Sequence, residues 1–455
     1  MSIPRIIVTG LSGGTGKTTI SLGITRAFAQ DGLCVHPFKK GPDYIDTAWL
    51  ELASGGRTGN LDPFFLDGNA LRRQFITRSS GADIAVIEGN RGYFDGRDIA
   101  GSASTAELAR HLDAPVILAV NITKMTRTTA ALVAGCKNFP GGERIVGIIL
   151  NYAGGNRHAA IARQAVEELA GLPVLGVLPR LSEAPIFERR AGLITVDMHE
   201  NAEDSLEKTA AFVREHVDLK TVLDLAHKAQ HLQIAQEPTE KKPARARIGV
   251  VRDDALWQYY AENLEALCHA GAELVFLSLF DAAPWPEIDA LYLGGGDIAP
   301  YASLLAAGVE RQKEIKARIE SGLPVYAEHA GYFYLCRVLA HAEKAYAMSG
   351  VFPVNIATTV KPVRLGYVEA VVNAENPFFT TGISFKGHEY HYANITMDGS
   401  VSSTLQKTTG TARHEDTDGL VYKNAFGTAM QLYAPAVPQW AHSFVHAAAK
   451  WRAEK

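Results

Sequence analysis

Glycines, threonines and a lysine are concentrated near the N-terminus, where residues 8–19 read VTGLSGGTGKTT. The backbone N–H groups of such glycines can close around phosphate oxygens at the positive end of a helix. Lys17 adds a positive charge near the β- and γ-phosphates, and the Thr18 hydroxyl is a natural Mg²⁺ ligand. The alternative is a strand–helix turn that binds nothing. Because Gly-Lys-Thr-Thr follows a hydrophobic strand, we predict a nucleotide site formed by Gly13, Gly14, Thr15, Gly16, Lys17, Thr18 and Thr19.

Charged side chains follow two further hydrophobic segments. Residues 34–38 read as a strand, and the sequence KKGPDYID, which contains Lys40, Asp43 and Asp46, comes directly after it. We predict that Lys40 binds the nucleotide. Glu88 closes the apolar segment 84–87, where an acid can hold Mg²⁺ directly or through water. The carboxyl ends of parallel strands form the ligand-binding edge of open α/β sheets. A charged, solvated loop is the alternative for residues 39–46, although the Gly-Pro turn favours a positioned carboxylate at Asp43.

Two more polar residues follow the strands of this first half. Asp95 lies in the loop after Glu88, where residues 90–96 read NRGYFDG. Asn151 comes directly after the apolar segment 145–150. An asparagine in that place either reads a nucleotide base or forms a buried turn, and the sequence leaves both roles open.

Short apolar segments alternate with helical segments along the first half of the chain. Residues 60–63, NLDP, predict a turn. This alternation of strand and helix predicts a doubly wound parallel sheet. The expected strands are residues 5–8, 34–38, 84–89, 115–120, 145–150 and 173–178, and the expected helices include residues 20–28 and 104–110.

A polar, basic segment separates two halves of the chain. We predict domains at residues 1–229 and 247–455, joined by a linker at residues 230–246 that contains two prolines and no apolar period. In the second half, residues 323–327 read as a strand, followed by a turn at residues 328–331 and a helix at residues 332–339. A strand, a sharp turn and a helix form the geometry of a nucleophile elbow.

The spacing of the glycine-rich stretch, with Ser12 where partition ATPases carry a signature lysine, resembles the dethiobiotin synthetase and cobyrinate synthetase branch of P-loop proteins. The segments 38–46, 60–63, 88–96 and 151–158 resemble the cobyrinic acid a,c-diamide synthase family in order and spacing. Asn121 departs from that pattern, which has an aspartate after the strand. The resemblance implies an α/β protein of two doubly wound domains, the first a P-loop domain like dethiobiotin synthetase and the second like a class I glutaminase.

The resemblance also implies the chemistry. Members of this family use ATP to activate acetate carboxylates of a tetrapyrrole as acyl phosphates, which ammonia converts to amides. It implies that ATP and Mg²⁺ are bound by Lys17, Thr18, Asp43 and Glu88. Asp46 and Asp95 would lie near the reacting carboxylate. Phosphoryl transfer to a carboxylate is mainly positioning and neutralisation of charge, which suits lysines, acids and a metal ion.

The second domain departs from the family at its reactive centre. The family pattern Ala-Glu-Cys-Gly-Gly is replaced here by AEHAG, so that His329 and Ala330 stand where the Cys-Gly pair is expected. An imidazole cannot form the glutamyl thioester that a glutaminase needs. Cys336 is expected to face the core, about 10 Å further along a helix. His391 matches the family's general base, but without a nucleophile we expect it to be structural or to line a ligand.

Composition narrows the setting of this chemistry. The formal net charge of −4 gives no reason to expect a nucleic-acid or anionic-membrane partner. Cys34, Cys136, Cys268 and Cys336 show neither a disulfide framework nor a zinc spacing. No apolar run approaches the ~20 residues of a membrane span, and no signal peptide is recognised, so a cytoplasmic protein is expected.

These observations lead to one main hypothesis and two alternatives. The main one is an ATP- and Mg²⁺-dependent ligase that amidates a tetrapyrrole with ammonia, either free or supplied by another protein. A sirohaem-type ring, amidated for a dissimilatory sulfite reductase, is the alternative substrate. A nucleotide-switched tetrapyrrole-binding protein is the alternative from another class. The sequence leaves open whether the chain forms a homodimer and which carboxylates react.

Overall fold

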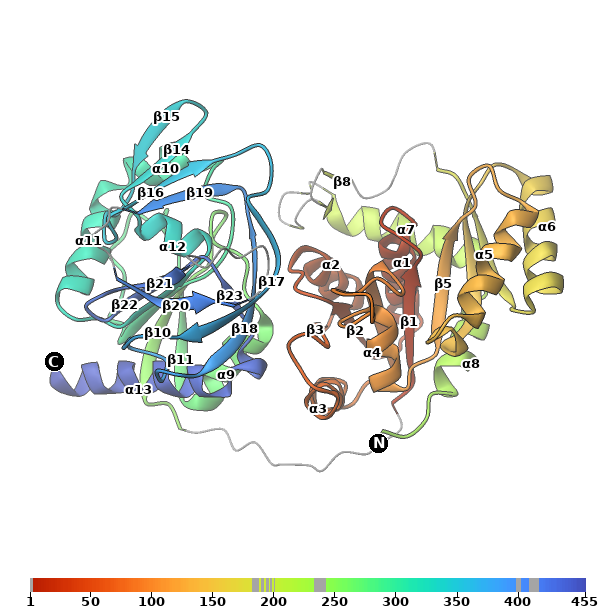
Figure 1. Cartoon of the computed structure of the whole chain (residues 1–455), viewed down its shortest axis with the longest axis horizontal. Coiled ribbons are helices and arrows are strands. Elements are labelled where there is room, and N and C mark those ends of the chain that lie inside the picture. The colour runs from red at the N-terminus through yellow and green to blue at the C-terminus, as the bar shows by residue number, and fades with distance from the viewer. Residues whose placement is uncertain are drawn as a thin grey trace. The chain divides into compact units, whose positions relative to one another are not determined.

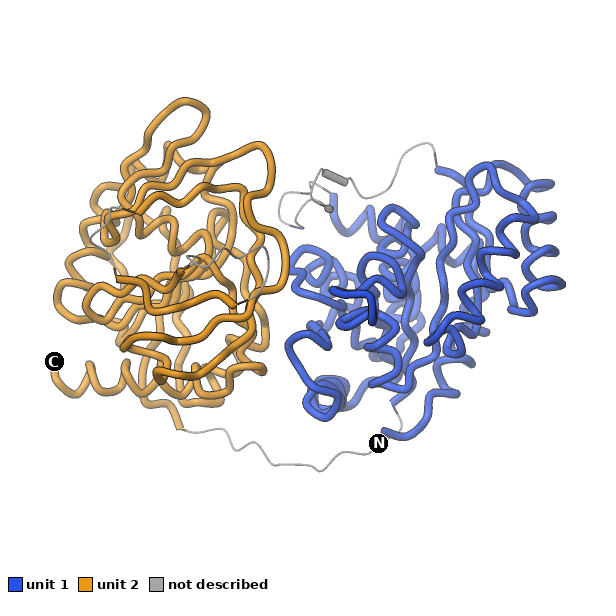
Figure 2. The backbone as a smooth tube through the Cα atoms, viewed as in Figure 1, with its two compact units in different colours: residues 1–236 blue, residues 237–455 orange. Residues whose placement is uncertain are grey.

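A computed structural model describes residues 3–181, 188–189, 192–193, 196, 199, 201–232, 243–397, 402–408 and 417–455. The chain divides into two compact units, Met1–Gln236 and Glu237–Lys455 (Figure 2). Most of the predicted linker, residues 233–242, lies outside the described residues. No helix among the residues described is both long and apolar enough to cross a lipid bilayer.

The first unit holds a sheet of seven strands in the order β3-β2-β4-β1-β5-β6-β7 (Figure 1). Every neighbouring pair in this sheet is parallel, which confirms the predicted doubly wound parallel sheet. The strands are β1 Arg5–Gly10, β2 Val35–Lys40, β3 Gly59–Leu61, β4 Ile84–Gly92, β5 Val116–Asn121, β6 Ile145–Ala153 and β7 Val174–Pro179.

Helices cover both faces of this sheet. On one face, Val8 of β1 shares a buried core with Ile24 of α1 and Val213 of α7. Side chains alternate along a strand, so Arg5 points to the other face, where its guanidinium donates to the carbonyl of Leu112 at the end of α4. The helices are α1 Lys17–Gln30, α2 Ile45–Ser54, α3 Gly68–Arg78, α4 Thr105–Leu112, α5 Arg127–Asn138, α6 Asn156–Ala165, α7 Ala202–His216 and α8 Leu219–His227.

The predicted turn at residues 60–63 is wrong in its first half. Asn60 and Leu61 belong to the edge strand β3, which pairs with β2 so that Lys39 lies opposite Asn60. The turn begins only at Asp62, whose carboxylate accepts the backbone N–H of Phe64. Pairing with a neighbouring strand outweighs the local turn preference of this segment.

The second unit is built on a mixed sheet of ten strands in the order β11-β10-β12-β13-β22-β21-β20-β17-β18-β23. The first five of these strands are mutually parallel, as expected for a doubly wound domain, and the remaining pairs are antiparallel. A smaller sheet has the order β15-β14-β16-β19, and β8 Glu188–Arg189 with β9 Gly192–Leu193 forms a separate pair in the first unit.

The elements of the second unit enclose two buried clusters, one of them rich in aromatic rings from β13, β22 and α13. The strands are β10 Ala246–Val251, β11 Ala272–Leu277, β12 Ala290–Leu293, β13 Val325–Glu328, β14 Val338–His341, β15 Lys344–Ala347, β16 Val354–Thr358, β17 Arg364–Val372, β18 Ser384–His391, β19 Ala393–Met397, β20 Ser403–Lys407, β21 Thr417–Tyr422, β22 Ala425–Thr428 and β23 Gln431–Leu432. The helices are α9 Ala261–Ala270, α10 Ala302–Ala307, α11 Val309–Glu320, α12 Ala330–Leu335 and α13 Pro438–Glu454.

The predicted helix at residues 332–339 is too long. Helix α12 ends at Leu335, and Val338 and Leu339 belong to β14, which pairs with both β15 and β16. Cys336 is therefore not on the helix, but it is fully buried, as predicted. The end of this apolar segment could by itself form a helix or a strand, and pairing with neighbouring strands decides for a strand.

Candidate active site

The glycine-rich stretch connects β1 to α1, with Gly13 and Gly14 exposed at its tip. Gly14 and Gly16 have left-handed φ values of 70° and 83°, which disfavour a side chain. A Cβ on Gly16 would also lie only 2.1 Å from the Asn151 side-chain nitrogen. Helix α1 begins at Lys17, so the backbone N–H groups of Thr18 and Thr19 lie in the first turn, where a helix attracts anions. This is the geometry of a phosphate-binding loop.

Asn151 holds this loop in place. Its side-chain nitrogen donates to the carbonyl oxygen of Thr15 at 3.0 Å, and its side-chain oxygen accepts the backbone N–H of Tyr152 at 2.9 Å. Both ends of the amide are thus engaged by the protein, as in the predicted buried turn. A role of Asn151 in reading a base stays a prediction.

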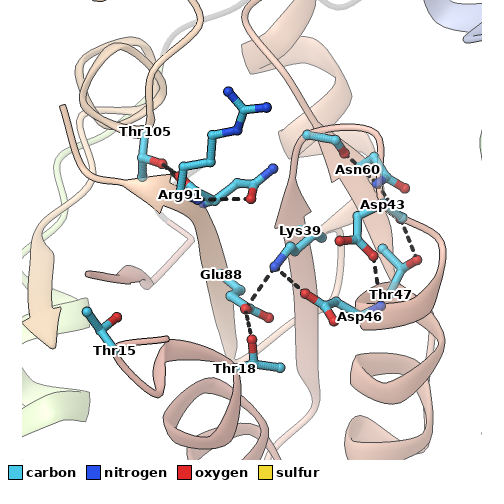
Figure 3. A network of polar contacts seen from close by, with 12 residues as sticks. Thr15, Thr18, Lys39, Asp43, Asp46, Thr47, Asn60, Glu88, Arg91 and Thr105 are labelled. Carbon is cyan, nitrogen blue, oxygen red and sulfur yellow. Dashed lines mark hydrogen bonds and ion pairs between the residues drawn. The ribbon is translucent and has the colours of Figure 1, made fainter. Parts of the chain in front are cut away.

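A network of polar contacts centred on Lys39 lies beside the phosphate loop (Figure 3). The Lys39 ammonium donates to Asp46 Oδ2 at 2.5 Å and to Glu88 Oε1 at 2.8 Å. The hydroxyl of Thr18 donates to the same Glu88 oxygen at 2.6 Å. The structure therefore connects the first turn of α1 with the ends of β2 and β4 and with α2.

Asp43 is joined to this network through the backbone. Its Oδ1 accepts the N–H of Asp46 at 2.8 Å, while its carbonyl accepts the Thr47 hydroxyl at 2.8 Å. The side-chain nitrogen of Asn60 donates to the carbonyls of Gly41 and Asp43 at 2.8 and 2.9 Å. These contacts fix the turn between β2 and α2, so Asp43 carries a positioned carboxylate.

Lys39 is the residue that sequence reasoning missed, because Lys40 was named, with Lys17, as a lysine that binds the nucleotide. That role of Lys40 stays a prediction. In the parallel register of β2 and β4, Lys39 pairs with Glu88. Consecutive residues of a strand point to opposite faces, so Lys40 points away from the network, toward Asp62 at 4.0 Å. The alternation of side chains along β2, combined with the position of Glu88 on β4, is the signal that could have separated the two lysines.

Burial and charge act against each other in this network. Burial alone lowers the pKa of Lys39, but the carboxylates of Asp46, Glu88 and Asp43 outweigh it and raise that pKa above its ordinary value. Burial raises the pKa of Glu88, and Lys39 opposes this effect. Burial, followed by the charge of Asp46, raises the pKa of Asp43 to about 7. Lys39 is therefore a permanent cation beside Glu88 and Asp43, two carboxyl groups whose pKa values are raised.

The residues predicted to hold Mg²⁺ fit that role. Glu88 Oε2 is buried and accepts no hydrogen bond from the described part of the chain, although Oε1 accepts two. Thr18 adds a hydroxyl to the same place, and Asp43 a further carboxylate. Mg²⁺ is commonly held by one or two carboxylates together with substrate phosphates and water. Within the described ranges, no group of three or more His, Cys, Asp or Glu side chains could hold a metal ion by itself.

Asp95 lies outside the Lys39 network. Its side chain is exposed in the loop after β4, and Oδ2 accepts the backbone N–H of Gly92 at 3.1 Å. A Cβ on Gly92 would meet both this oxygen, at 2.4 Å, and the carbonyl of Leu11, at 2.5 Å. Asp95 is therefore next to the phosphate loop, and its predicted role near the reacting carboxylate stays a prediction.

The second unit keeps the elbow that its sequence predicts. His329 joins β13 to α12 with φ 51° and ψ −117°, a strained conformation for a residue with a side chain. Its imidazole Nδ1 accepts the backbone N–H of Gly296 at 3.4 Å, and its ring centre lies 6.5 Å from that of His391. Burial lowers the pKa of His329 to about 3 and that of His391 to about 4, so both rings are neutral.

No thiol described in the structure takes the place of the missing nucleophile. Cys336 is fully buried, its sulfur donates to the carbonyl of Tyr332 at 3.3 Å, and burial raises the pKa of its thiol. A raised pKa disfavours the thiolate that attacks an amide carbon. His391 instead makes a T-shaped contact with Phe333, with ring centres 5.7 Å apart, and its Nε2 lies 4.0 Å from Glu389 Oε2.

These two units define the chain as a P-loop nucleotide-binding protein that also carries a unit of the glutamine amidotransferase type. The family described as "CobQ/CobB/MinD/ParA nucleotide binding domain" matches residues 6–191. The family described as "CobB/CobQ-like glutamine amidotransferase domain" matches residues 247–434.

Full-length relatives narrow the class to a family. Three proteins named cobyrinate a,c-diamide synthase match nearly the whole chain. That of Magnetococcus marinus is 37% identical over 96% of this chain and 96% of its own. That of Archaeoglobus fulgidus is 35% identical over 99% and 98%, and that of Picrophilus torridus 35% over 98% and 99%. The chain belongs to the cobyrinate a,c-diamide synthase family, which confirms the resemblance seen in the sequence.

Proposed function

We propose that this chain uses ATP to amidate side-chain carboxylates of cobyrinate, the substrate in its relatives' name, with ammonia as the nitrogen donor. The Lys39 network beside the phosphate loop carries the proposal for the first step. Attack of a substrate carboxylate oxygen on the γ-phosphorus of ATP expels ADP and forms an acyl phosphate. Ammonia then attacks the acyl carbon, inorganic phosphate leaves and the nitrogen loses a proton.

The residues of the first unit divide this work. Lys17 and Lys39 offset the negative charge of phosphate and carboxylate, which is the main requirement of phosphoryl transfer. Two of the three N–H donors of Lys39 go to Asp46 and Glu88, and the third is left for a ligand oxygen. Thr18, Asp43 and Glu88 would hold Mg²⁺, which when bound neutralises the phosphate oxygens.

The choice of ammonia rests on the second unit. His329 stands at the elbow where a glutaminase needs a thiolate, and its imidazole engages the backbone N–H of Gly296. Cys336, the other thiol near this turn, is buried with a raised pKa. The second unit therefore keeps the elbow of a glutaminase but offers no nucleophile that could attack glutamine.

Incubation of the purified protein with cobyrinate, ATP and Mg²⁺, and with either ammonium or glutamine, tests the proposal. Mass spectrometry should show amidated cobyrinate with ammonium, and glutamine should release no glutamate above background. Strong turnover with glutamine would contradict the ammonia assignment. ATP hydrolysis that ignores cobyrinate, with no amide formed, would favour the nucleotide-switched binding protein. A parallel incubation with sirohaem tests the alternative ring.

A further inference from the structure

Arg91 occupies an unusual place at the end of β4, three residues after Glu88. Its backbone is in the left-handed region, with φ 53°, where a residue with a side chain costs roughly 1–3 kcal/mol. The side-chain oxygen of Asn90 accepts the Arg91 backbone N–H at 2.9 Å and so holds this conformation. Such strain is found mainly where the surrounding structure uses it to aim a functional group.

The conformation directs the Arg91 side chain away from the acids. Figure 3 shows the guanidinium extending from β4 on the side opposite to Asp46 and Thr18. The side chain is exposed, and among the described residues no carboxylate forms an ion pair with it. Glu88 and Arg91 are three residues apart on β4, so their side chains point to opposite faces of the strand.

Arg91 also adds to the positive charge at this end of the sheet. Lys40 points to the same side of the network, and after burial and Asp62, the charge of Arg91 has the largest effect on its pKa and lowers it. A Cβ on Gly41 would lie 2.8 Å from the Asn90 side-chain nitrogen, so the ends of β2 and β4 that carry Lys40 and Arg91 are packed against each other. Lys40 is buried beside Asp62, whereas Arg91 is exposed and forms no ion pair within the described part of the chain. The Arg91 guanidinium, with the charge of Lys40 behind it, can therefore attract an anion.

We propose that Arg91, backed by Lys40, binds a carboxylate of the substrate that does not react. The inference rests on the proposed function, because it takes cobyrinate, which carries several carboxylates, as the substrate. It places the recognition of one of these carboxylates on the side of β2 and β4 that carries Lys40 and Arg91. The phosphates of ATP are the other source of such an anion. The substrate is favoured because the phosphate loop and Lys39 serve the opposite side of β4 and β2.

Steady-state kinetics of Arg91→Gln separate the two anions. The variant should raise KM for cobyrinate about 10-fold, the effect of losing a charge-assisted hydrogen bond, with kcat and KM for ATP unchanged within about 2-fold. Arg91→Lys keeps the charge and should recover part of the loss. The control is Arg110→Gln, which removes an exposed arginine on α4 and should change neither KM.

Equilibrium binding of cobyrinate without ATP, followed by its absorbance, gives a readout independent of turnover. Kd for cobyrinate should rise by the same factor in Arg91→Gln, and raised salt should weaken binding to the wild type more than to the variant. An unchanged KM and Kd for cobyrinate in an active Arg91→Gln protein would overturn the inference alone. A rise in KM for ATP only would assign Arg91 to phosphate. A wild-type protein that binds and amidates no cobyrinate would instead overturn the proposed function.

Discussion

Lys39 lies opposite Glu88 in the register of β2 and β4, and its ammonium donates to Glu88 Oε1 at 2.8 Å. The same ammonium donates to Asp46, so one buried cation holds two acids together. The Thr18 hydroxyl completes the link to the phosphate loop. A ligand that enters this network meets charges whose positions are already fixed, which is the condition for effective electrostatic catalysis.

Replacement of Lys39 by methionine should therefore abolish amidation. We expect kcat to fall at least ~100-fold, because the positive charge is lost where phosphoryl transfer needs it. The buried Glu88 and the partly buried Asp46 would also lose their cation, so the free energy of unfolding should fall by about 3–5 kcal/mol. Product formation and thermal unfolding measure the two effects. Lys208→Met, which changes an exposed lysine on α7, is the matched control, and a folded Lys39→Met protein with unaltered kcat would refute the role.

Thr18 should set the requirement for magnesium. In Thr18→Ala the hydroxyl is lost, and we expect the Mg²⁺ concentration for half-maximal activity to rise about 10-fold or more. Thr18→Ser keeps a hydroxyl at the same place and should stay within about 3-fold of the wild type. Titration of Mg²⁺ at saturating ATP gives the comparison. Equal Mg²⁺ dependence in the alanine and serine variants would show that the hydroxyl is not a ligand.

Asn151 should matter for ATP through the shape of the phosphate loop. Asn151→Ala removes the hydrogen bond to the Thr15 carbonyl and leaves a gap beside Gly16. We expect KM for ATP to rise about 10-fold, the effect of losing a buried hydrogen bond, while KM for cobyrinate is unchanged. Asn138→Ala, at an exposed asparagine near the end of α5, is the control. If Asn151→Ala raised KM for purine nucleotides but not for nucleotides with other bases, this result would support a role of Asn151 in reading the base instead.

The buried histidines of the second unit should make the protein less stable in weak acid. Burial lowers the pKa of His329 and of His388 to about 3, against about 6.5 in an unfolded chain. Below pH 6.5 the unfolded chain therefore binds protons that the folded chain does not. The stabilisation is complete above pH 6.5 and is lost as the pH falls toward 3.

Denaturant unfolding at pH 7.5 and 5.5 measures this loss. Each such histidine should lower the free energy of unfolding by about 1.4 kcal/mol when the pH falls from 7.5 to 5.5. His329→Gln should remove one contribution, whereas His269→Gln, at an exposed position on α9, should remove none. If the free energy of unfolding changed between pH 7.5 and 5.5 by the same amount in His329→Gln and in the wild type, that result would contradict the buried, neutral state of the His329 ring.

The sequence by itself determined the parallel sheet of the first unit, the phosphate loop and the presence of a histidine, not a cysteine, at the elbow of the second unit. Each of these depends on local information: an apolar run, a glycine spacing, or the identity of one side chain. The family likewise follows from motifs that lie within short segments. Asp43 and Asp46 after β2, and Glu88 on β4, were found for the same reason, because each directly follows a recognisable apolar segment.

Only the tertiary structure decided which lysine joins the network of Asp46 and Glu88. Lys39 and Lys40 are neighbours of the same type, and their roles differ because β2 turns one toward Glu88 and the other toward Asp62. The edge strand β3 and the early end of α12 were also decided by pairing with other strands. The direction of Arg91 depends on a left-handed backbone that its own sequence does not favour. In each case, contacts between segments distant in sequence outweigh the local preference, since many buried contacts together exceed the small energy differences between local conformations.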